Sequence, residues 1–97
     1  ILNGYLPGQG IRPHVDLARF GHLVLGVSLG SACDLEFTPE QQVSWTERLE
    51  PGDVYLMMGD ARWRWMHGIP ERMVDIVKGQ ETTRGTRISI TLRRLAD

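Results

Sequence analysis

The segment RISITLR, residues 87–93, carries the strictest pattern in the sequence, because polar and aliphatic residues alternate along it without a break. Successive side chains of a β-strand point to opposite faces, so this alternation predicts a strand with one aliphatic and one polar face. The polar face carries Arg87, Ser89, Thr91 and Arg93, and the aliphatic face carries Ile88, Ile90 and Leu92. The arginine face requires either water, as on a solvated edge strand, or an anion held inside the fold.

The rest of the chain also favours β-structure. Short segments rich in apolar and β-branched residues, at 1–6, 21–30, 32–37, 43–50 and 54–58, are separated by turn signals such as PGQG and PGD. We expect a buried strand at 54–58, a loop at 39–42, a loop or short irregular segment at 72–85, and no amphipathic helix. These signals predict an all-β fold, and specifically a double-stranded β-helix, or jelly roll, which commonly holds a metal between its sheets.

Composition narrows the class of protein. Ninety-seven residues, 41% hydrophobic and 24% charged, indicate one globular domain over residues 1–97. A formal net charge of −1 gives no overall attraction to nucleic acid or to an anionic membrane. Cys33 is the single cysteine, which favours a buried thiol in a reducing, intracellular compartment. Because the chain opens at Ile1 inside a strand-like segment, we expect a piece of a longer protein.

Two histidines and one aspartate are candidate metal ligands. His14 and Asp16 stand two residues apart after a Gly- and Pro-rich turn, so in an extended chain both point to one face. His67, in RWRWMHGIP, can return alongside them, whereas we expect His22 in solvent. Two imidazoles and one carboxylate are the ligand set of non-haem Fe(II) oxygenases. The pattern alone is weak, because such triplets also arise by chance.

The arginines of the last strand add to this hypothesis. Two guanidinium groups six residues apart, Arg87 and Arg93, can grip both carboxylates of a small dicarboxylic acid. Beside an iron site, 2-oxoglutarate is the candidate.

Five motifs resemble the core of the AlkB-type Fe(II)/2-oxoglutarate dioxygenases, in that family's order and spacing. They are NGY, PGQGIRPHVD, VSLGS, PGDVYLMMGDARWRWMHGI and RISITLRR. Within the family the chain looks most similar to the branch of AlkB homologue 8 and its fungal relatives. The resemblance implies a core domain without the N-terminal lid elements that cover the substrate.

The resemblance also implies a role for each site residue. His14, Asp16 and His67 match the iron ligands. Arg87 matches the arginine that pairs with the far carboxylate of 2-oxoglutarate, and Arg93 matches the second arginine, near the chelating carboxylate. Asn3 and Tyr5 match the pair that hydrogen-bonds the same molecule.

Two positions depart from the family pattern. Ser89 stands where several members carry Asn, and Ala18, followed by Arg19, stands where DNA-repair members carry an acidic residue. Base recognition therefore cannot be carried over directly. The substrate-side candidates are Arg19, Trp63 and Trp65; the tryptophans can stack a base or pack in the core.

The expected function is oxidation by Fe(II), 2-oxoglutarate and dioxygen, giving succinate and CO2, with demethylation or hydroxylation of a modified nucleobase in RNA or DNA. Two alternatives stay open. One is a 2-oxoglutarate-dependent hydroxylase of a protein side chain or small molecule. The other is a non-catalytic metal-binding or RNA-interaction module.

Overall fold

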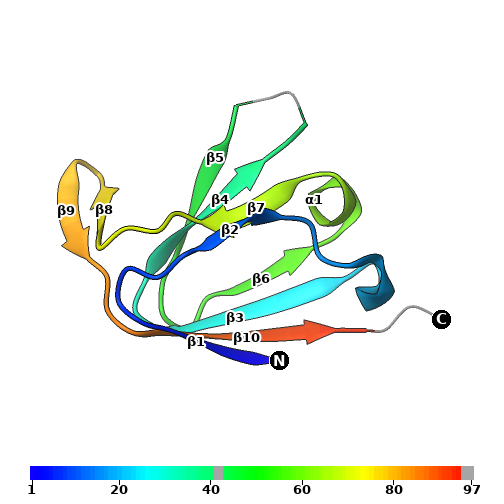
Figure 1. The fold of residues 1–97 in the computed structure, drawn as a ribbon, viewed down its shortest axis with the longest axis horizontal. Helices are drawn as coiled ribbons and strands as arrows, with labels where there is room; N and C mark the ends of the chain where they lie inside the picture. The colour runs from blue at the N-terminus through cyan, green and yellow to red at the C-terminus, as the bar shows by residue number, and fades with distance from the viewer. Residues whose placement is uncertain (41–42, 95–97) are drawn as a thin grey trace.

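The computed structural model describes residues 1–40 and 43–94, which form two four-stranded antiparallel sheets facing each other, with a hairpin at one end (Figure 1). The strands are β1 (Leu2–Tyr5), β2 (Ile11–His14), β3 (Val24–Gly30), β4 (Cys33–Thr38), β5 (Trp45–Leu49), β6 (Val54–Met57), β7 (Met66–Ile69), β8 (Val74–Val77), β9 (Gln80–Thr83) and β10 (Arg87–Arg93). The sheets have the orders β1-β10-β3-β6 and β2-β7-β4-β5. The predicted all-β jelly roll is confirmed. Residues 41 and 42 of the predicted loop at 39–42 lie outside the described residues.

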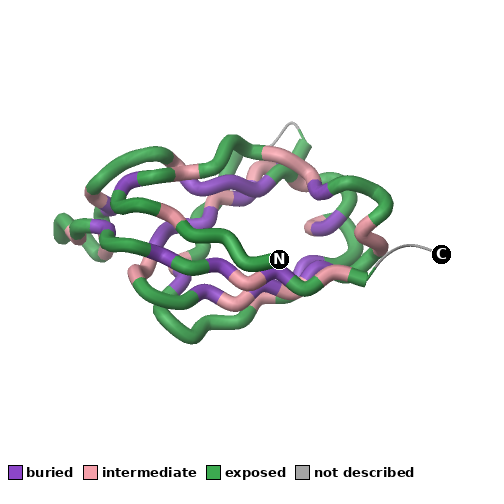
Figure 2. The backbone as a smooth tube through the Cα atoms, turned by 60° about the horizontal axis from the view of Figure 1, so that its bottom comes forward, coloured by how far each residue is buried: buried purple, intermediate pink, exposed green. Residues whose placement is uncertain are grey.

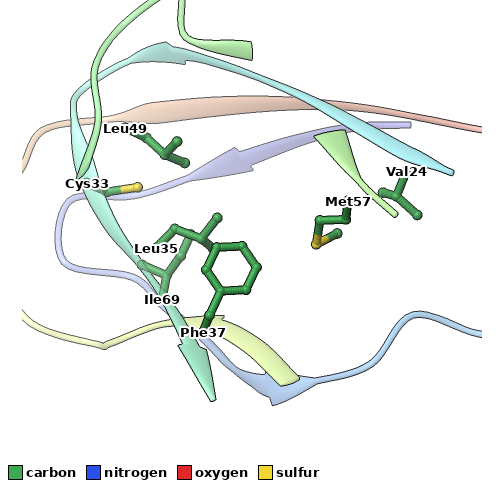
Figure 3. Close-up of a cluster of buried hydrophobic side chains, with 7 residues drawn as sticks. All are labelled: Val24, Cys33, Leu35, Phe37, Leu49, Met57 and Ile69. Carbon is green, nitrogen blue, oxygen red and sulfur yellow. The ribbon is translucent and has the colours of Figure 1, made fainter. Parts of the chain in front are cut away.

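The hydrophobic core lies between the two sheets (Figure 3). It consists of Val24, Cys33, Leu35, Phe37, Leu49, Met57 and Ile69. Cys33 is 2% exposed, as the sequence predicted. Burial raises the pKa of its thiol, which favours the neutral form and a packing role.

The alternation predicted for β10 is confirmed. Arg87, Ser89 and Thr91 are buried, whereas Ile88 and Leu92 are exposed on the outer face. Buried and partly buried residues alternate along residues 24–28 of the neighbouring strand β3 as well (Figure 2). Strand β10 therefore turns its aliphatic face outward and its polar face toward the second sheet.

Strand β6 corrects one sequence prediction. We expected residues 54–58 to be a buried strand, but Val54, Leu56 and Met58 are 61%, 52% and 57% exposed. Side chains alternate along this strand, so Tyr55 and Met57 point inward while their neighbours lie on the outer face of the first sheet.

A short α-helix, α1 (Gly59–Trp63), precedes β7, and a 3-10 turn, η1 (Ala18–Phe20), lies shortly after Asp16. Both are too short to show a helical period in the sequence. Among the described residues, no helix is long and apolar enough to cross a membrane.

The segment 72–85, expected to be a loop or short irregular segment, instead contains the hairpin β8–β9. Its turn is Lys78–Gly79, with φ of 51° and 79°. A two-residue turn with both φ values positive is a common hairpin connection, but its usual residues are Asn-Gly or Asp-Gly. Lysine gives no such signal, which is why the hairpin was missed.

A buried network of ion pairs joins the hairpin to the second sheet. Asp75 of β8 is fully buried and accepts hydrogen bonds from Arg84 to both of its oxygens, at 2.9 and 2.7 Å. Arg48 of β5 and Arg72 also donate to Asp75, each at 2.8 Å. The same two arginines donate to Asp34 of β4 at 3.0 Å. The carboxylates of Asp75 and Asp34 thus link the hairpin to strands β4 and β5 through these arginines.

The network gives the protein an expected sensitivity to acid. Burial alone would raise the pKa of Asp75, but the hydrogen bonds from Arg84, Arg72 and Arg48 outweigh it and lower the pKa from 3.8 to about 2. A lowered folded-state pKa stabilises the protein above the unfolded value, and that stability is lost as pH falls from 3.8 toward 2. We expect this carboxylate to lower the free energy of unfolding by about 1.5 kcal/mol over this range, measured by urea denaturation. A free energy of unfolding that stays constant over this pH range would contradict the pairing of ionised Asp75 with the three arginines.

Candidate metal centre

The two histidines meet because their strands pair. His14 ends β2, His67 lies in β7, and the antiparallel register places His14 directly opposite His67. Opposite residues of paired strands have neighbouring side chains, and the two imidazole centroids are 4.4 Å apart. Asp16 follows β2 by two residues, on the same side as His14.

The donor atoms of these residues converge. Asp16 Oδ1 lies 3.3 Å from His14 Nε2 and 3.4 Å from His67 Nε2. One donor atom from each of the three residues lies within 4.8 Å of the others, as a shared metal ion requires. Two nitrogens and one carboxylate oxygen are a donor set suited to Fe(II).

The surroundings of the histidines fit metal binding. His14 Nδ1 lies 2.8 Å from the carbonyl oxygen of Arg12. A carbonyl can only accept, so Nδ1 carries the hydrogen, and the neutral ring keeps its Nε2 lone pair for a metal. The Nε2 atom of His67 is the nitrogen that faces the other donor atoms. Its Nδ1 atom is buried and has no hydrogen-bond partner among the described residues.

The aspartate is held as an anion. Hydrogen bonds that His14 and His67 donate when protonated, and the charge of Arg93, keep the pKa of Asp16 well below its usual range. The same carboxylate, chiefly through its hydrogen bond, raises the pKa of His14. Arg93 Nε donates to Asp16 Oδ2 at 2.9 Å, which leaves Oδ1 turned toward the histidines. Arg93 thus binds the carboxylate of the candidate metal ligand Asp16.

Arg87 occupies another part of the same cavity. It is 5% exposed, its Nε donates to Ser28 Oγ at 2.9 Å, and its guanidinium lies 5.2 Å from the centre of the Tyr5 ring. No carboxylate among the described residues forms an ion pair with Arg87. This buried cation is therefore free to bind an anion from outside the chain. The predicted ligands and cosubstrate residues all line this one cavity: Asn3, Tyr5, His14, Asp16, His67, Arg87 and Arg93.

Sequence reasoning missed two residues of this region. Tyr55 of β6 lines the cavity, and Ser28 of β3, which is fully buried, accepts the hydrogen bond from Arg87. A Cβ at Gly26 would lie 2.1 Å from a carbon of the Tyr55 ring, so a glycine is needed there. The alternation of β3, which puts Val24, Gly26 and Ser28 on one face, was the available signal.

The substrate-side candidates lie elsewhere. Trp65 packs edge-on against Trp45, with ring centroids 4.7 Å apart. The Trp63 ring lies against the Arg62 guanidinium at 4.1 Å, and Arg19 lies 5.2 Å from the centre of the Phe20 ring. None of the three candidates lines the cavity of the histidines, while His22 is exposed as expected.

A jelly roll that brings two imidazoles and one carboxylate together between its sheets has the architecture of non-haem Fe(II) oxygenases. The chain belongs to the 2OG-Fe(II) oxygenase superfamily, whose family model matches residues 1–93. Membership implies Fe(II) and 2-oxoglutarate as cofactor and cosubstrate, as the sequence predicted.

Several similar proteins carry AlkB-type names. An uncharacterized protein of Acanthamoeba polyphaga mimivirus, L905, is 38% identical over 98% of this chain and 47% of its own length. Mouse tRNA (carboxymethyluridine(34)-5-O)-methyltransferase ALKBH8 is 34% identical over 87% of the chain and 13% of its own length. Mouse mitochondrial alkB homolog 7 is also 34% identical, over 94% of this chain and 42% of its own length.

The chain thus spans less than half the length of these relatives. The solved structure of OsALKBH1 superimposes with a TM-score of 0.71 at 20% identity, over 96% of this chain and 46% of that one, which supports the fold. The predicted AlkB resemblance is confirmed, and the likeness to fungal relatives stays a prediction.

Proposed function

We propose that residues 1–97 form the catalytic core of a 2-oxoglutarate-dependent dioxygenase that hydroxylates or oxidatively demethylates a modified nucleobase in RNA or DNA. His14, Asp16 and His67 hold Fe(II), and Arg87, Arg93, Asn3 and Tyr5 hold 2-oxoglutarate. The observation that carries this proposal is the convergence of three metal-donor atoms and an unpaired buried arginine in one cavity.

The chain's own contribution is binding and orientation. Iron and 2-oxoglutarate, when bound, supply the oxidising chemistry with dioxygen. The Arg12 carbonyl fixes the His14 tautomer, and Arg93 orients the Asp16 carboxylate. Arg87, oriented by Ser28, offers its guanidinium fork to the distant carboxylate of the cosubstrate.

The names of similar proteins support a nucleic-acid substrate. One relative is named a tRNA methyltransferase, and an Arabidopsis thaliana relative, 29% identical, is named an alkylated DNA repair protein. The test is to incubate the protein with Fe(II), 2-oxoglutarate and N-methylated oligonucleotides and to measure succinate and formaldehyde. Substrate-dependent release of both supports demethylation. Succinate release stimulated only by protein or small-molecule substrates would favour the alternative hydroxylase, and no succinate at all would favour the non-catalytic module.

The metal assignment makes a separate prediction. His67→Ala removes one of three ligands, so we expect the Mn(II) affinity, measured by calorimetry, to fall by more than about 100-fold. Such a loss exceeds the usual effect of removing a residue that only hydrogen-bonds a metal ligand. Succinate formation should be lost with it. His22→Ala, at an exposed histidine, is the control and should bind Mn(II) normally. Unchanged Mn(II) affinity in His67→Ala would exclude this site.

A further inference from the structure

Arg62 is a buried cation outside the ligand set. It lies in α1, five residues before His67, and at 1% exposure it is among the largest fully buried side chains of the described residues. None of the described carboxylates forms an ion pair with it. Burying a charge in this way is costly unless hydrogen bonds replace the lost water.

The hydrogen bonds of Arg62 all go to the loop that carries Asp16. Its NH1 donates to the carbonyl oxygen of Asp16 at 3.0 Å, and its NH2 to that of Leu17 at 2.8 Å. Its Nε donates to the carbonyl oxygen of Gly21 at 2.7 Å. Each nitrogen of the guanidinium therefore binds a different backbone carbonyl.

This loop needs such support because Asp16 does not lie in a strand. Strand β2 ends at His14, and the chain then passes through η1 to reach β3 at Val24. Strand pairing fixes His14 and His67, but it does not fix Asp16. Loop backbone is more mobile than strand backbone, and a displaced carboxylate would separate the donor atoms.

We propose that Arg62 is a positioning residue of the metal centre: it clamps the Asp16–Gly21 loop to α1 and so sets Asp16 against the two histidines. Arg62 holds the Asp16 carbonyl while Arg93 holds the Asp16 carboxylate, so the aspartate is fixed at both its main chain and its side chain. The same side chain links the loop after β2 to the helix that leads into β7, and thus couples the segments of two ligands. This inference rests on the proposed metal assignment.

An arginine is required for this role. Three donors fixed in one plane reach three carbonyls at set positions, whereas the point charge of a lysine cannot reproduce that fork. The Trp63 ring, 4.1 Å from the guanidinium carbon, covers one face of the cation and favours the same orientation.

The test compares Mn(II) affinity and thermal stability in the same variants. We expect Arg62→Met to raise the Mn(II) dissociation constant by about 10- to 100-fold, the usual effect of losing an outer partner of a metal site. At saturating Mn(II), its affinity for 2-oxoglutarate should stay within about 2-fold of the parent protein. Arg62→Lys should fold and show a smaller rise in the Mn(II) dissociation constant. This variant tests the positioning role if Arg62→Met does not fold.

Two controls separate positioning from general stability. Arg64→Met changes an exposed arginine two residues further along the chain and should leave Mn(II) binding unchanged. Leu49→Ala weakens the core away from the loop and should lower the melting temperature without changing Mn(II) affinity. If the Arg62 variants lose only stability, as Leu49→Ala does, the positioning role is wrong. If His67→Ala also retains Mn(II), the metal assignment fails instead.

Discussion

Replacing Arg87 by Met should raise the dissociation constant for 2-oxoglutarate by about 30-fold or more, while Mn(II) binding stays nearly intact. Arg87 is a buried cation that no described carboxylate neutralises, so the cosubstrate supplies its partner. Removing one partner of a buried, hydrogen-bonded charge pair costs roughly 2–5 kcal/mol, and each 1.4 kcal/mol is about tenfold in affinity. Arg87→Lys keeps the charge but loses the fork, so its affinity should also fall substantially.

The measurement is 2-oxoglutarate titration by calorimetry in the presence of Mn(II). Arg94→Met, at an exposed arginine just beyond β10, is the matched control and should bind the cosubstrate normally. Ser28→Ala removes the hydrogen bond that orients Arg87 and should give an intermediate loss. Equal affinity in Arg87→Met would mean that Arg87 serves the fold and that another residue holds the distant carboxylate.

The features predicted correctly from the sequence are those with a local period or a matching motif. Alternation in 87–93 predicted which residues of β10 face inward, and the spacing of two placed His14 and Asp16 on one side. The meeting with His67 depends on the register between β2 and β7, which no local pattern encodes. His67 was chosen from the two remaining histidines because His22 was expected in solvent, and the family resemblance then supported the choice.

The features that sequence reasoning missed depend on contacts between distant segments. Arg62 reaches carbonyls 41 to 46 residues away, and its neighbours RWRW gave no sign of a helix or of burial. Trp63 belongs to the short helix α1, so the strand-like spacing with His67 does not hold for it, and Trp65 packs on Trp45 and Phe37. Substrate-side residues therefore could not be read from spacing alone.

The second large effect concerns stability. We expect Asp75→Asn to lower the free energy of unfolding by about 3–5 kcal/mol, because removing one partner of a buried ion pair leaves the others uncompensated. Asp75 receives hydrogen bonds from three arginines, and Arg84, 3% exposed in its side chain, has no other carboxylate among its partners in the described structure. A loss of this size is a large part of the stability of a small domain.

Urea denaturation at neutral pH measures the effect, and Asp60→Asn is the control. Asp60 is 69% exposed and pairs with Arg64 at 3.8 Å, so its loss should cost less than about 1 kcal/mol. Because Asp75 joins β8 to β4 and β5 through Arg72 and Arg48, hydrogen exchange should rise first in the β8–β9 hairpin of Asp75→Asn. An Asp75→Asn protein as stable as the Asp60→Asn control would show that the arginines find water or other partners, and that the hairpin is held by packing alone.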